Sequence, residues 1–421
     1  MQLQSCACHW CSIVPPYVLD RMQSSSNPDV RRSAEVTRSA DAVFRTTRAN
    51  IMAATPMSKL ALAAEPAPLK RVVYDSAHTN DLARTRVLEE GGELPDDDSV
   101  REAYAGAETT WKFYNQIFQR SSVDNDGLTL VSSVHYRQNY NNAVWNGQQM
   151  AYGDGDGVIF GRFTRSLDVI GHELTHGVTQ YSAGLQYAGQ SGALNEHFSD
   201  VFGILVKQWS LNETNPQTAG WLIGEGLLLP QINGKALRSM SDPGTAYDDE
   251  PSGLGKDPQP AHMRSYQELP DTQDGDHGGV HINSGIPNKA FHLAATAIGE
   301  PAWQTAGKIW YVTLTERLRP DADFEKCAKE TISVARDFFG NDVGEKVAAA
   351  WVAVGVTEAG TGPMASLTPA AISRIRAGAS LLKGPKAKKV KKAKKAAKAK
   401  PAKKVAAKRV TAKTKKRARK K

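Results

Sequence analysis

The sequence has 421 residues, enough for two or three domains with a large core, and its 40% hydrophobic content is typical of a globular protein. Its net charge of +9 is unevenly distributed, because residues 383–421 hold 21 of the 53 basic residues and no acidic one. The other 32 basic residues stand against 44 acidic residues, so an acidic body with a charge of −12 carries a basic tail. No apolar run reaches 18 residues, which argues against a transmembrane helix.

The N-terminus lacks the features of a secretory signal. No basic region precedes its apolar stretch at residues 13–19, and two prolines interrupt that stretch. We therefore expect a cytoplasmic protein, with leaderless secretion to the extracellular space as the alternative. Three of the four cysteines lie within residues 6–11 and Cys327 stands alone, so no disulfide framework is predicted. The N-terminal cysteines could instead bind a metal together with His9, although the cluster lacks a second ligand pair.

Local patterns predict strands in the first half of the chain. A helix is expected over residues 29–53, followed by an Ala- and Pro-rich linker. The patterns then predict a strand at 71–75, a helix at 99–120 capped by Asp98 or Ser99, an edge strand at 141–147, and further strands at 128–136 and 150–152. Residues 154–157, Asp-Gly-Asp-Gly, are interpreted as a turn because the other ligands of a calcium loop are missing.

The second half is predicted to be helical. Helical spacing of apolar residues indicates helices at 193–208, 290–297, 301–318, 324–339 and 341–354. Pro301 suits the first position of its helix, where an amide hydrogen is not needed. The stretch 212–281 is rich in Pro, Gly and Asp, and such long loops often carry function.

The most informative motif is His-Glu-Leu-Thr-His at residues 172–176, with apolar neighbours that can bury one side of a helix. On a helix His172 and His176 are one turn apart on the same face, where two imidazoles can hold one zinc ion. Glu173 lies beside that face and can take a proton from a zinc-bound water. The alternative is two ordinary surface histidines beside a glutamate.

A third zinc ligand is predicted twenty residues downstream, where glycines allow the chain to turn back. Glu196 and Asp200 are four residues apart and face the same way on a helix. Glu196 can reach the metal while Asp200 accepts the other N–H of a ligating histidine. His197 points about 100° away from Glu196 and is interpreted as structural.

These residues resemble the thermolysin family of zinc endopeptidases. The likeness includes Gly-Ala-Leu-Asn-Glu-x-x-Ser-Asp at 192–200, the edge strand 141–147, and segments 237–243 and 278–286, and it spans about residues 70–356. The resemblance implies an α+β fold with a β-rich N-terminal domain, a mostly helical C-terminal domain and a zinc site in the cleft between them. It also implies a neutral endopeptidase that uses one catalytic zinc ion, acts on protein or peptide substrates and is a monomer.

By the same resemblance, each site residue has an expected role. His172, His176 and Glu196 would bind zinc and Glu173 would be the general base. His281 and Tyr187 would donate hydrogen bonds to the oxyanion, and Asp276 would orient His281. Asp200 and Asn195 would hold the zinc-binding histidines. Arg238 would bind a substrate carbonyl in a fork, and Asn142 and Ala143 would pair with the substrate backbone. Phe160, Phe163, Val169 and Leu237 match the family's pocket for a bulky apolar residue after the cleaved bond.

The sequence departs from the best-known members of the family in two places. Lys207 and Leu222 occupy positions of the family's double calcium site, where only Asp168 and Glu225 remain, so we predict that this double site is absent. Calcium binding elsewhere stays open. The short N-terminal segment carries a Pro-Pro-apolar motif at residues 15–19 and resembles that of the protealysin-like subgroup. It is therefore expected to be an inhibitory propeptide that the enzyme removes by cutting the linker.

The expected organisation has four parts. Residues 1–65 are the propeptide and linker, 66–178 the N-terminal catalytic domain, 179–357 the helical C-terminal domain, and 358–421 a disordered basic tail. Residues 383–421 could bind DNA, RNA or another polyanion in a salt-dependent way. The competing hypothesis is a nucleic-acid-binding protein whose peptidase fold is ancillary or weakly active.

Overall fold

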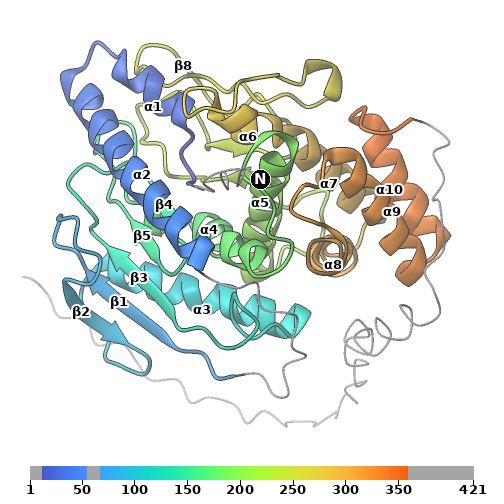
Figure 1. Cartoon of the computed structure of the whole chain (residues 1–421), viewed down its shortest axis with the longest axis horizontal. Coiled ribbons are helices and arrows are strands. Elements are labelled where there is room, and N and C mark those ends of the chain that lie inside the picture. Colours follow the sequence, from blue (N-terminus) through green and yellow to red (C-terminus); the bar gives the residue numbers. More distant parts are fainter. Residues whose placement is uncertain (1–11, 55–66, 359–421) are drawn as a thin grey trace, which may run out of the picture. The chain divides into compact units, whose positions relative to one another are not determined.

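The computed structural model describes residues 12–54 and 67–358. The linker cleavage site, the N-terminal cysteine cluster and the basic tail lie outside these residues. Within them, a five-stranded mixed sheet has the order β2-β1-β3-β5-β4 (Figure 1). Its strands are β1 (Arg71–Asp75), β2 (Thr85–Glu89), β3 (Leu130–Val134), β4 (Ala143–Trp145) and β5 (Met150–Tyr152). The predicted edge strand is thus confirmed as β4.

Helix α3 (Asp98–Phe118) packs against β1 and β3 of this sheet and against helix α4 (Leu167–Gln180). Three residues of the apolar face that predicted this helix are buried, namely Tyr104, Tyr114 and Phe118. The predicted cap was one residue late, because Asp97 is the residue whose carboxylate accepts the amide of Val100. The sequence 97–99, Asp-Asp-Ser, offers three capping residues in a row, so its composition could not select one.

The predicted helices of the second half occur in order, and one further helix, Asp276–Asn283, lies largely in the stretch predicted as loop (Figure 1). Its helices are α5 (Gly189–Leu211), α6 (Asp276–Asn283), α7 (Gly285–Ile298), α8 (Thr305–Val312), α9 (Phe324–Phe339) and α10 (Asn341–Ala353). The predicted start at Pro301 is wrong, since α8 begins at Thr305 and continues as a π-helical turn, η3 (Thr313–Arg317). Together these elements form the expected α+β fold, a sheet-containing N-terminal part followed by a helical C-terminal part.

The long loop before α6 contains short paired segments. These are β6 (Leu222–Ile223) with β7 (Arg238–Ser239), and β8 (Asp248–Asp249) with β9 (Gly255–Lys256). Short 3-10 turns occur at η1 (Phe163–Arg165) and η2 (Met263–Ser265). Each pair spans only two residues per strand, which is too short to produce an alternating pattern in the sequence.

The N-terminal segment folds as helices α1 (Pro16–Gln23) and α2 (Pro28–Ala54). In Figure 1, α2 crosses the sheet near β4 and β5, and the Arg48 guanidinium donates to the carbonyl of Trp145 on β4 over 2.8 Å. Helix α1 was not predicted, although Pro16 occupies its first turn as proline often does.

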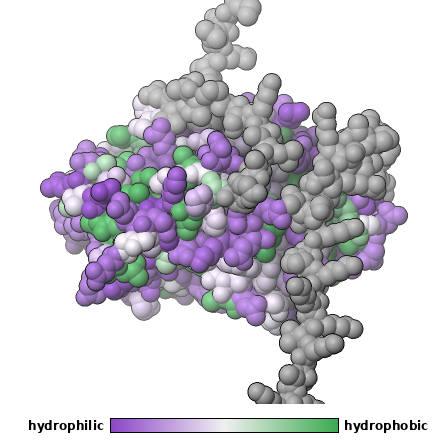
Figure 2. Space-filling model, turned by 90° about the horizontal axis from the view of Figure 1, so that it is seen from below, coloured by the Kyte–Doolittle hydropathy of each residue, from purple (hydrophilic) through white to green (hydrophobic). Residues whose placement is uncertain are grey.

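No helix among the described residues is long and apolar enough to cross a membrane. Figure 2 shows a face where hydrophilic side chains predominate outside the grey atoms.

Candidate active site

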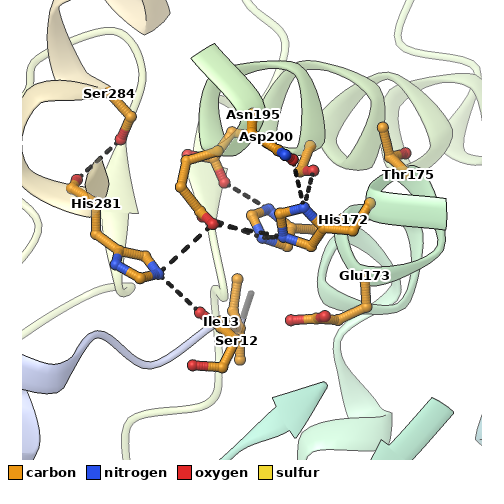
Figure 3. A network of polar contacts seen from close by, with 12 residues as sticks. Ser12, Ile13, His172, Glu173, Thr175, Asn195, Asp200, His281 and Ser284 are labelled. Atoms are coloured by element: carbon orange, nitrogen blue, oxygen red, sulfur yellow. Dashed lines mark hydrogen bonds and ion pairs between the residues drawn. The ribbon is translucent and has the colours of Figure 1, made fainter. Parts of the chain in front are cut away.

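Helices α4 and α5 approach closely enough to bring three side chains to one point (Figure 3). A Cβ at Gly203 of α5 would lie 2.5 Å from the carbonyl oxygen of Asp168 on α4, so this approach requires glycine. His172 and His176 project from α4 with their Nε2 atoms 3.0 Å apart. Glu196 of α5 faces both imidazoles, with its carboxylate oxygens 3.4 and 3.5 Å from the two Nε2 atoms. All three side chains are fully buried.

Hydrogen bonds behind the two imidazoles fix which nitrogen carries the proton. His172 Nδ1 lies 2.8 Å from a carboxylate oxygen of Asp200, which can only accept, so Nδ1 is the donor. His176 Nδ1 lies 2.9 Å from Asn195 Oδ1, and the Asn195 amide is oriented because its Nδ2 donates to the carbonyl of Leu185. Both Nε2 atoms therefore present lone pairs to the same point, which is the arrangement that a metal ion requires.

The facing atoms fit a zinc ion. Their separations of 3.0–3.5 Å are close to the roughly 3.4 Å expected between ligands of a tetrahedral zinc with bonds of about 2.0–2.1 Å. Among the described residues, the buried Glu196 Oε2 has no hydrogen-bond partner, and such an oxygen needs a donor or a cation. His172, Glu173 and His176 also bring ligand atoms within 4.8 Å of one another. Glu196 is the better third ligand, because Glu173 Oε2 accepts the amide of Trp145 over 2.8 Å.

Glu173 is placed to act as a base beside this point. Its Oε1 is buried and has no hydrogen-bond partner among the described residues, while Oε2 is held by the backbone of β4. Burial raises the pKa of Glu173 to about 8, with the Glu196 carboxylate adding to the rise and the His172 imidazole opposing it. A nearby divalent cation would lower this pKa and leave a carboxylate that can accept a proton at neutral pH.

Arg238 on β7 is held by the carboxylate that supports His172. Its Nε and Nη2 donate to the two oxygens of Asp200 over 2.9 and 2.8 Å. The fork is thus made onto Asp200, and among the described residues the contact of Arg238 with a backbone carbonyl, that of Ile13, is made by Nη1 alone. Although burial alone would raise it, Arg238 and the His172 N–H hold the pKa of Asp200 well below its usual range.

His281 enters the site from α6 on the opposite side to α4 (Figure 3). Asp276 accepts from His281 Nδ1 over 2.5 Å and from its backbone amide over 2.8 Å, as predicted for an orienting partner. This tight loop uses left-handed backbone at Gly278 and Gly279, with φ of 84° and 75°, which glycine adopts without strain. His281 Nε2 lies 3.1 Å from the oxygen of the Tyr187 hydroxyl, and this hydroxyl donates its hydrogen to Glu196.

The predicted pocket residues all lie inside the protein core. The side chains of Phe160, Phe163, Val169 and Leu237 are at most 3% exposed and belong to one hydrophobic cluster. His197 is structural, as predicted, because its Nδ1 contacts Asn288 Oδ1 and its Nε2 accepts from the Trp310 indole. Burial lowers its pKa to about 4, so it remains neutral.

Residues 12–14 of the N-terminal segment lie in this site and run antiparallel to β4, with one isolated bridge between Ser12 and Val144. The Ile13 amide donates to the carbonyl of Ala143 over 3.3 Å, and the Asn142 side chain bonds both the amide and the carbonyl of Val14. His281 Nε2 donates to the Ser12 carbonyl over 2.9 Å. Asn142, Ala143, Arg238 and His281 therefore bind a backbone as predicted for a substrate, and that backbone belongs to the same chain.

Lys207 lies beside the two acids, Asp168 and Glu225, that remain at the position of the double calcium site predicted to be absent. Its ammonium lies 3.6 Å from the carboxylate of the buried Asp168 and 3.0 Å from that of Glu225. Burial lowers the pKa of Lys207, but the two carboxylates outweigh this effect and raise it above the ordinary value. A protonated lysine thus neutralises the acids that a cation would otherwise bridge.

Two features of the site escaped the sequence analysis. The backbone amide of Trp145 donates to Glu173, and a backbone contact of this kind cannot be predicted from the identities of the side chains. Asn288, which donates to Asp200 over 2.9 Å, lies 88 residues away from it along the chain. Only the run Asn-Ser-Gly-Ile-Pro-Asn at 283–288, polar within an otherwise apolar helical region, gave a signal there.

Comparison with known proteins gives the same assignment. The thermolysin metallopeptidase catalytic domain matches residues 73–180, and the thermolysin metallopeptidase alpha-helical domain matches residues 183–356. An extracellular metalloprotease of Pectobacterium carotovorum subsp. carotovorum is 47% identical over 347 residues, which are 82% of this chain and 96% of the relative. Protease PrtS of Photorhabdus sp. (strain Az29) is also 47% identical, over 68% of this chain and 76% of its own.

A solved structure resembles the chain over the same range. The precursor of protealysin, a metalloproteinase from Serratia proteamaculans, has a TM-score of 0.74 and 47% identity, and the match covers 82% of this chain and all of that one. The likeness therefore includes a precursor and extends beyond the two catalytic domains. The chain belongs to the thermolysin family of metallopeptidases and is a metalloendopeptidase.

Proposed function

We propose that this metalloendopeptidase binds one zinc ion through His172, His176 and Glu196 and is made as a precursor that blocks its own site. The convergence of two Nε2 lone pairs on the unpartnered oxygen of Glu196 carries the zinc assignment. Bound there, zinc would polarise the scissile carbonyl and lower the pKa of a water molecule to about 7. The experiment that tests this assignment is metal analysis of the Glu173→Gln protein, described in the Discussion.

Glu173 would act as the general base. Its unpartnered Oε1 is beside the metal point, and the backbone of Trp145 keeps the carboxylate from turning away. It would take the proton of the attacking water and pass it to the leaving amine. His281 and Tyr187 would donate to the oxygen that gains charge, because His281 Nε2 already donates to a carbonyl oxygen, that of Ser12.

The substrate would bind as an added strand on β4. The Ala143 carbonyl and the Asn142 side chain supply the backbone contacts, as they do for residues 13 and 14. The apolar residues Phe160, Phe163, Val169 and Leu237 would accept a bulky apolar side chain just after the cleaved bond. Digestion of an unbiased peptide mixture by the mature enzyme should yield new N-termini enriched in Leu, Ile, Val and Phe. An enrichment of charged residues there would contradict the pocket assignment.

Residues 1–65 would be an inhibitory propeptide, cut by the enzyme in the linker. Supporting contacts extend along α2, where Asp41 accepts from the hydroxyl of Tyr140 and the amide of Asn142, over 2.7 and 3.1 Å. The bond to Asn142 links α2 to a side chain that also binds Val14. Docking of α2 and occupation of the site are therefore coupled through one residue of the mature enzyme.

Release of the cleaved propeptide is expected to be faster at pH 8 than at pH 5. Burial raises the pKa of Asp41 from 3.8 to about 7, so the docked state favours the protonated acid. The contribution of protonated Asp41 to propeptide binding is complete below about pH 4 and is lost as the pH rises through 7. This loss weakens the affinity of the cleaved propeptide for the enzyme by at most roughly 10³-fold. Size-exclusion chromatography with mass spectrometry would measure how much cleaved propeptide stays bound at each pH.

Asp41→Asn should flatten this pH dependence. Asparagine is uncharged at both pH values, and its Oδ1 can still accept a hydrogen bond of the kind that Asp41 accepts from Asn142. Asp29→Asn, at an exposed position of the same helix, is the matched control and should leave the pH dependence unchanged. The same retention of propeptide by wild type at pH 5 and pH 8 would contradict the role of Asp41.

We further propose that residues 383–421 bind polyanions such as DNA or RNA. The support is the count of 21 basic residues without an acidic one. Removing residues 383–421 should leave peptide hydrolysis unchanged and abolish binding to duplex DNA at low salt, measured by fluorescence anisotropy. Unchanged DNA binding after the truncation would contradict this role of residues 383–421. The alternative of a nucleic-acid-binding protein with an ancillary peptidase predicts that the full-length protein cleaves peptides weakly at every pH.

A further inference from the structure

A second cluster of metal-binding side chains lies at one end of the sheet, apart from the zinc site. His78 follows β1, His135 follows β3 and Asp154 follows β5. One ligand atom from each of the three lies within 4.8 Å of the other two. His78 Nδ1 and His135 Nδ1 are 3.6 and 2.8 Å from the same oxygen, Asp154 Oδ2. The three side chains therefore converge on one point, although 57 residues separate the first from the second.

The backbone holds the two histidines in place. The parallel pairing of β1 with β3 continues past both strands, because His78 N donates to the His135 carbonyl over 2.8 Å and Arg137 N donates to the Thr79 carbonyl over 2.9 Å. His78 and His135 both have left-handed backbone, with φ of 59° and 52°. This conformation is uncommon for a residue with a Cβ, and here it turns both imidazoles toward Asp154.

A carboxylate behind His135 fixes its role. His135 Nε2 lies 3.0 Å from Asp97 Oδ2, which can only accept, so Nε2 carries a proton. By the same argument Nδ1 donates to Asp154 Oδ2 over 2.8 Å in this structure, and it is the nitrogen that would bind a metal once that proton is displaced. A histidine whose far N–H donates to a carboxylate is the usual arrangement around a protein-bound metal. Asp97 is itself fixed, because its other oxygen caps α3 by accepting the amide of Val100.

We propose that His78, His135 and Asp154 form a second binding site for a transition-metal dication such as zinc. Two imidazoles and one carboxylate are a ligand set that zinc accepts. The 3.6 Å separation is already close to the roughly 3.4 Å expected between tetrahedral ligands, and the 2.8 Å one would widen. His78 is 54% exposed and Asp154 29%, so water can complete the coordination and the ion can exchange with solvent.

An ion at this point would brace the substrate-binding edge. Asp154 lies between Gly153, whose amide donates to the carbonyl of Asn142, and Gly155, whose amide donates to the carbonyl of Tyr140. The ion would thus join the ends of β1 and β3 to the segment that supports the start of β4. The competing arrangement is a proton on His135 Nδ1, which makes this imidazole a cation between Asp154 and Asp97.

Zinc titration of the full chain distinguishes these arrangements. The Glu173→Gln protein, which should not cut itself, is first loaded with one zinc equivalent and then titrated with zinc by calorimetry. We expect His78→Asn in this background to lose one equivalent or to bind it at least tenfold more weakly. Asparagine tolerates left-handed backbone, so the loop should keep its shape. His262→Asn is the matched control, because His262 caps a 3-10 turn outside the cluster and asparagine can also cap.

Thermal unfolding provides the second measurement. Added zinc should raise Tm in the parent and in His262→Asn but not in His78→Asn or Asp154→Asn. The Tm of each variant before zinc is added reports whether it folds. Identical zinc isotherms and identical Tm shifts in the parent and the two site variants would overturn the proposal and leave the protonated imidazole as the explanation. A loss confined to the site variants supports the metal site and does not depend on whether the enzyme cleaves peptides.

Discussion

Replacing Glu173 with glutamine is expected to lower peptide hydrolysis about 10²–10⁴-fold while one zinc ion stays bound. Glutamine keeps the shape of the side chain and can still accept the Trp145 amide, but it cannot take a proton from water. The zinc-facing atoms of His172, His176 and Glu196 are unchanged by the substitution. Steady-state hydrolysis of a quenched fluorescent peptide and metal analysis of the same sample measure both outcomes.

The same substitution should also stop self-cleavage in the linker. Purified Glu173→Gln protein is expected to keep its full mass of 421 residues, whereas wild type loses its N-terminal segment. Glu325→Gln is a suitable control, because Glu325 pairs with Lys329 on the surface of α9 and lies outside the site. Hydrolysis by Glu173→Gln at the wild-type rate would mean that another group acts as the base.

Replacing His281 with phenylalanine is expected to reduce kcat about 10²–10³-fold, since one donor to a developing oxyanion contributes about 2.7–4 kcal/mol. The zinc content should not change, because His281 Nε2 is 3.6 Å from Glu196 and its own carboxylate partner is Asp276. The propeptide should also bind more weakly, because His281 donates to the Ser12 carbonyl. Stopped-flow assays of the mature enzyme and retention of cleaved propeptide measure the two effects separately.

A matched variant separates a local effect from a general loss of stability. His292→Phe removes a histidine of α7 that packs against the Trp221 ring and has no contact with the site. It should retain wild-type kcat. If His281→Phe leaves kcat unchanged, the oxyanion is bound by Tyr187 or by other groups, and the role assigned to His281 is wrong.

The site could be predicted further than the rest of the chain because its chemistry imposes a fixed spacing. The four-residue interval between His172 and His176 is one helical turn, and the interval between Glu196 and Asp200 is the same. Helices with a long apolar face, such as α9, were predicted to their exact ends for a related reason, since the face repeats over several turns. Periodicity carries little information about short elements such as β6 and β7.

The contacts that the sequence could not supply are between residues far apart in the chain. Arg238 was expected to fork onto a substrate carbonyl, whereas in this structure it forks onto Asp200, a residue of α5 that lies 38 positions before it in the chain. Residues 12–14 carry an apolar pattern that fits many sites, and their pairing with β4 depends on where α1 and α2 dock. His78 and His135 likewise meet through the register of β1 and β3.

The central claim is that a zinc-dependent site in this chain is blocked by its own N-terminal segment until the enzyme cuts the linker. Mass spectrometry of the freshly purified protein over time, with and without a zinc chelator, tests it most directly. The account predicts that the untreated protein loses an N-terminal fragment ending within the Ala- and Pro-rich linker, residues 57–69, and that chelator prevents the loss until zinc is restored. Loss of the same fragment at the same rate in the presence of chelator, or a cut inside residues 12–54, would contradict it.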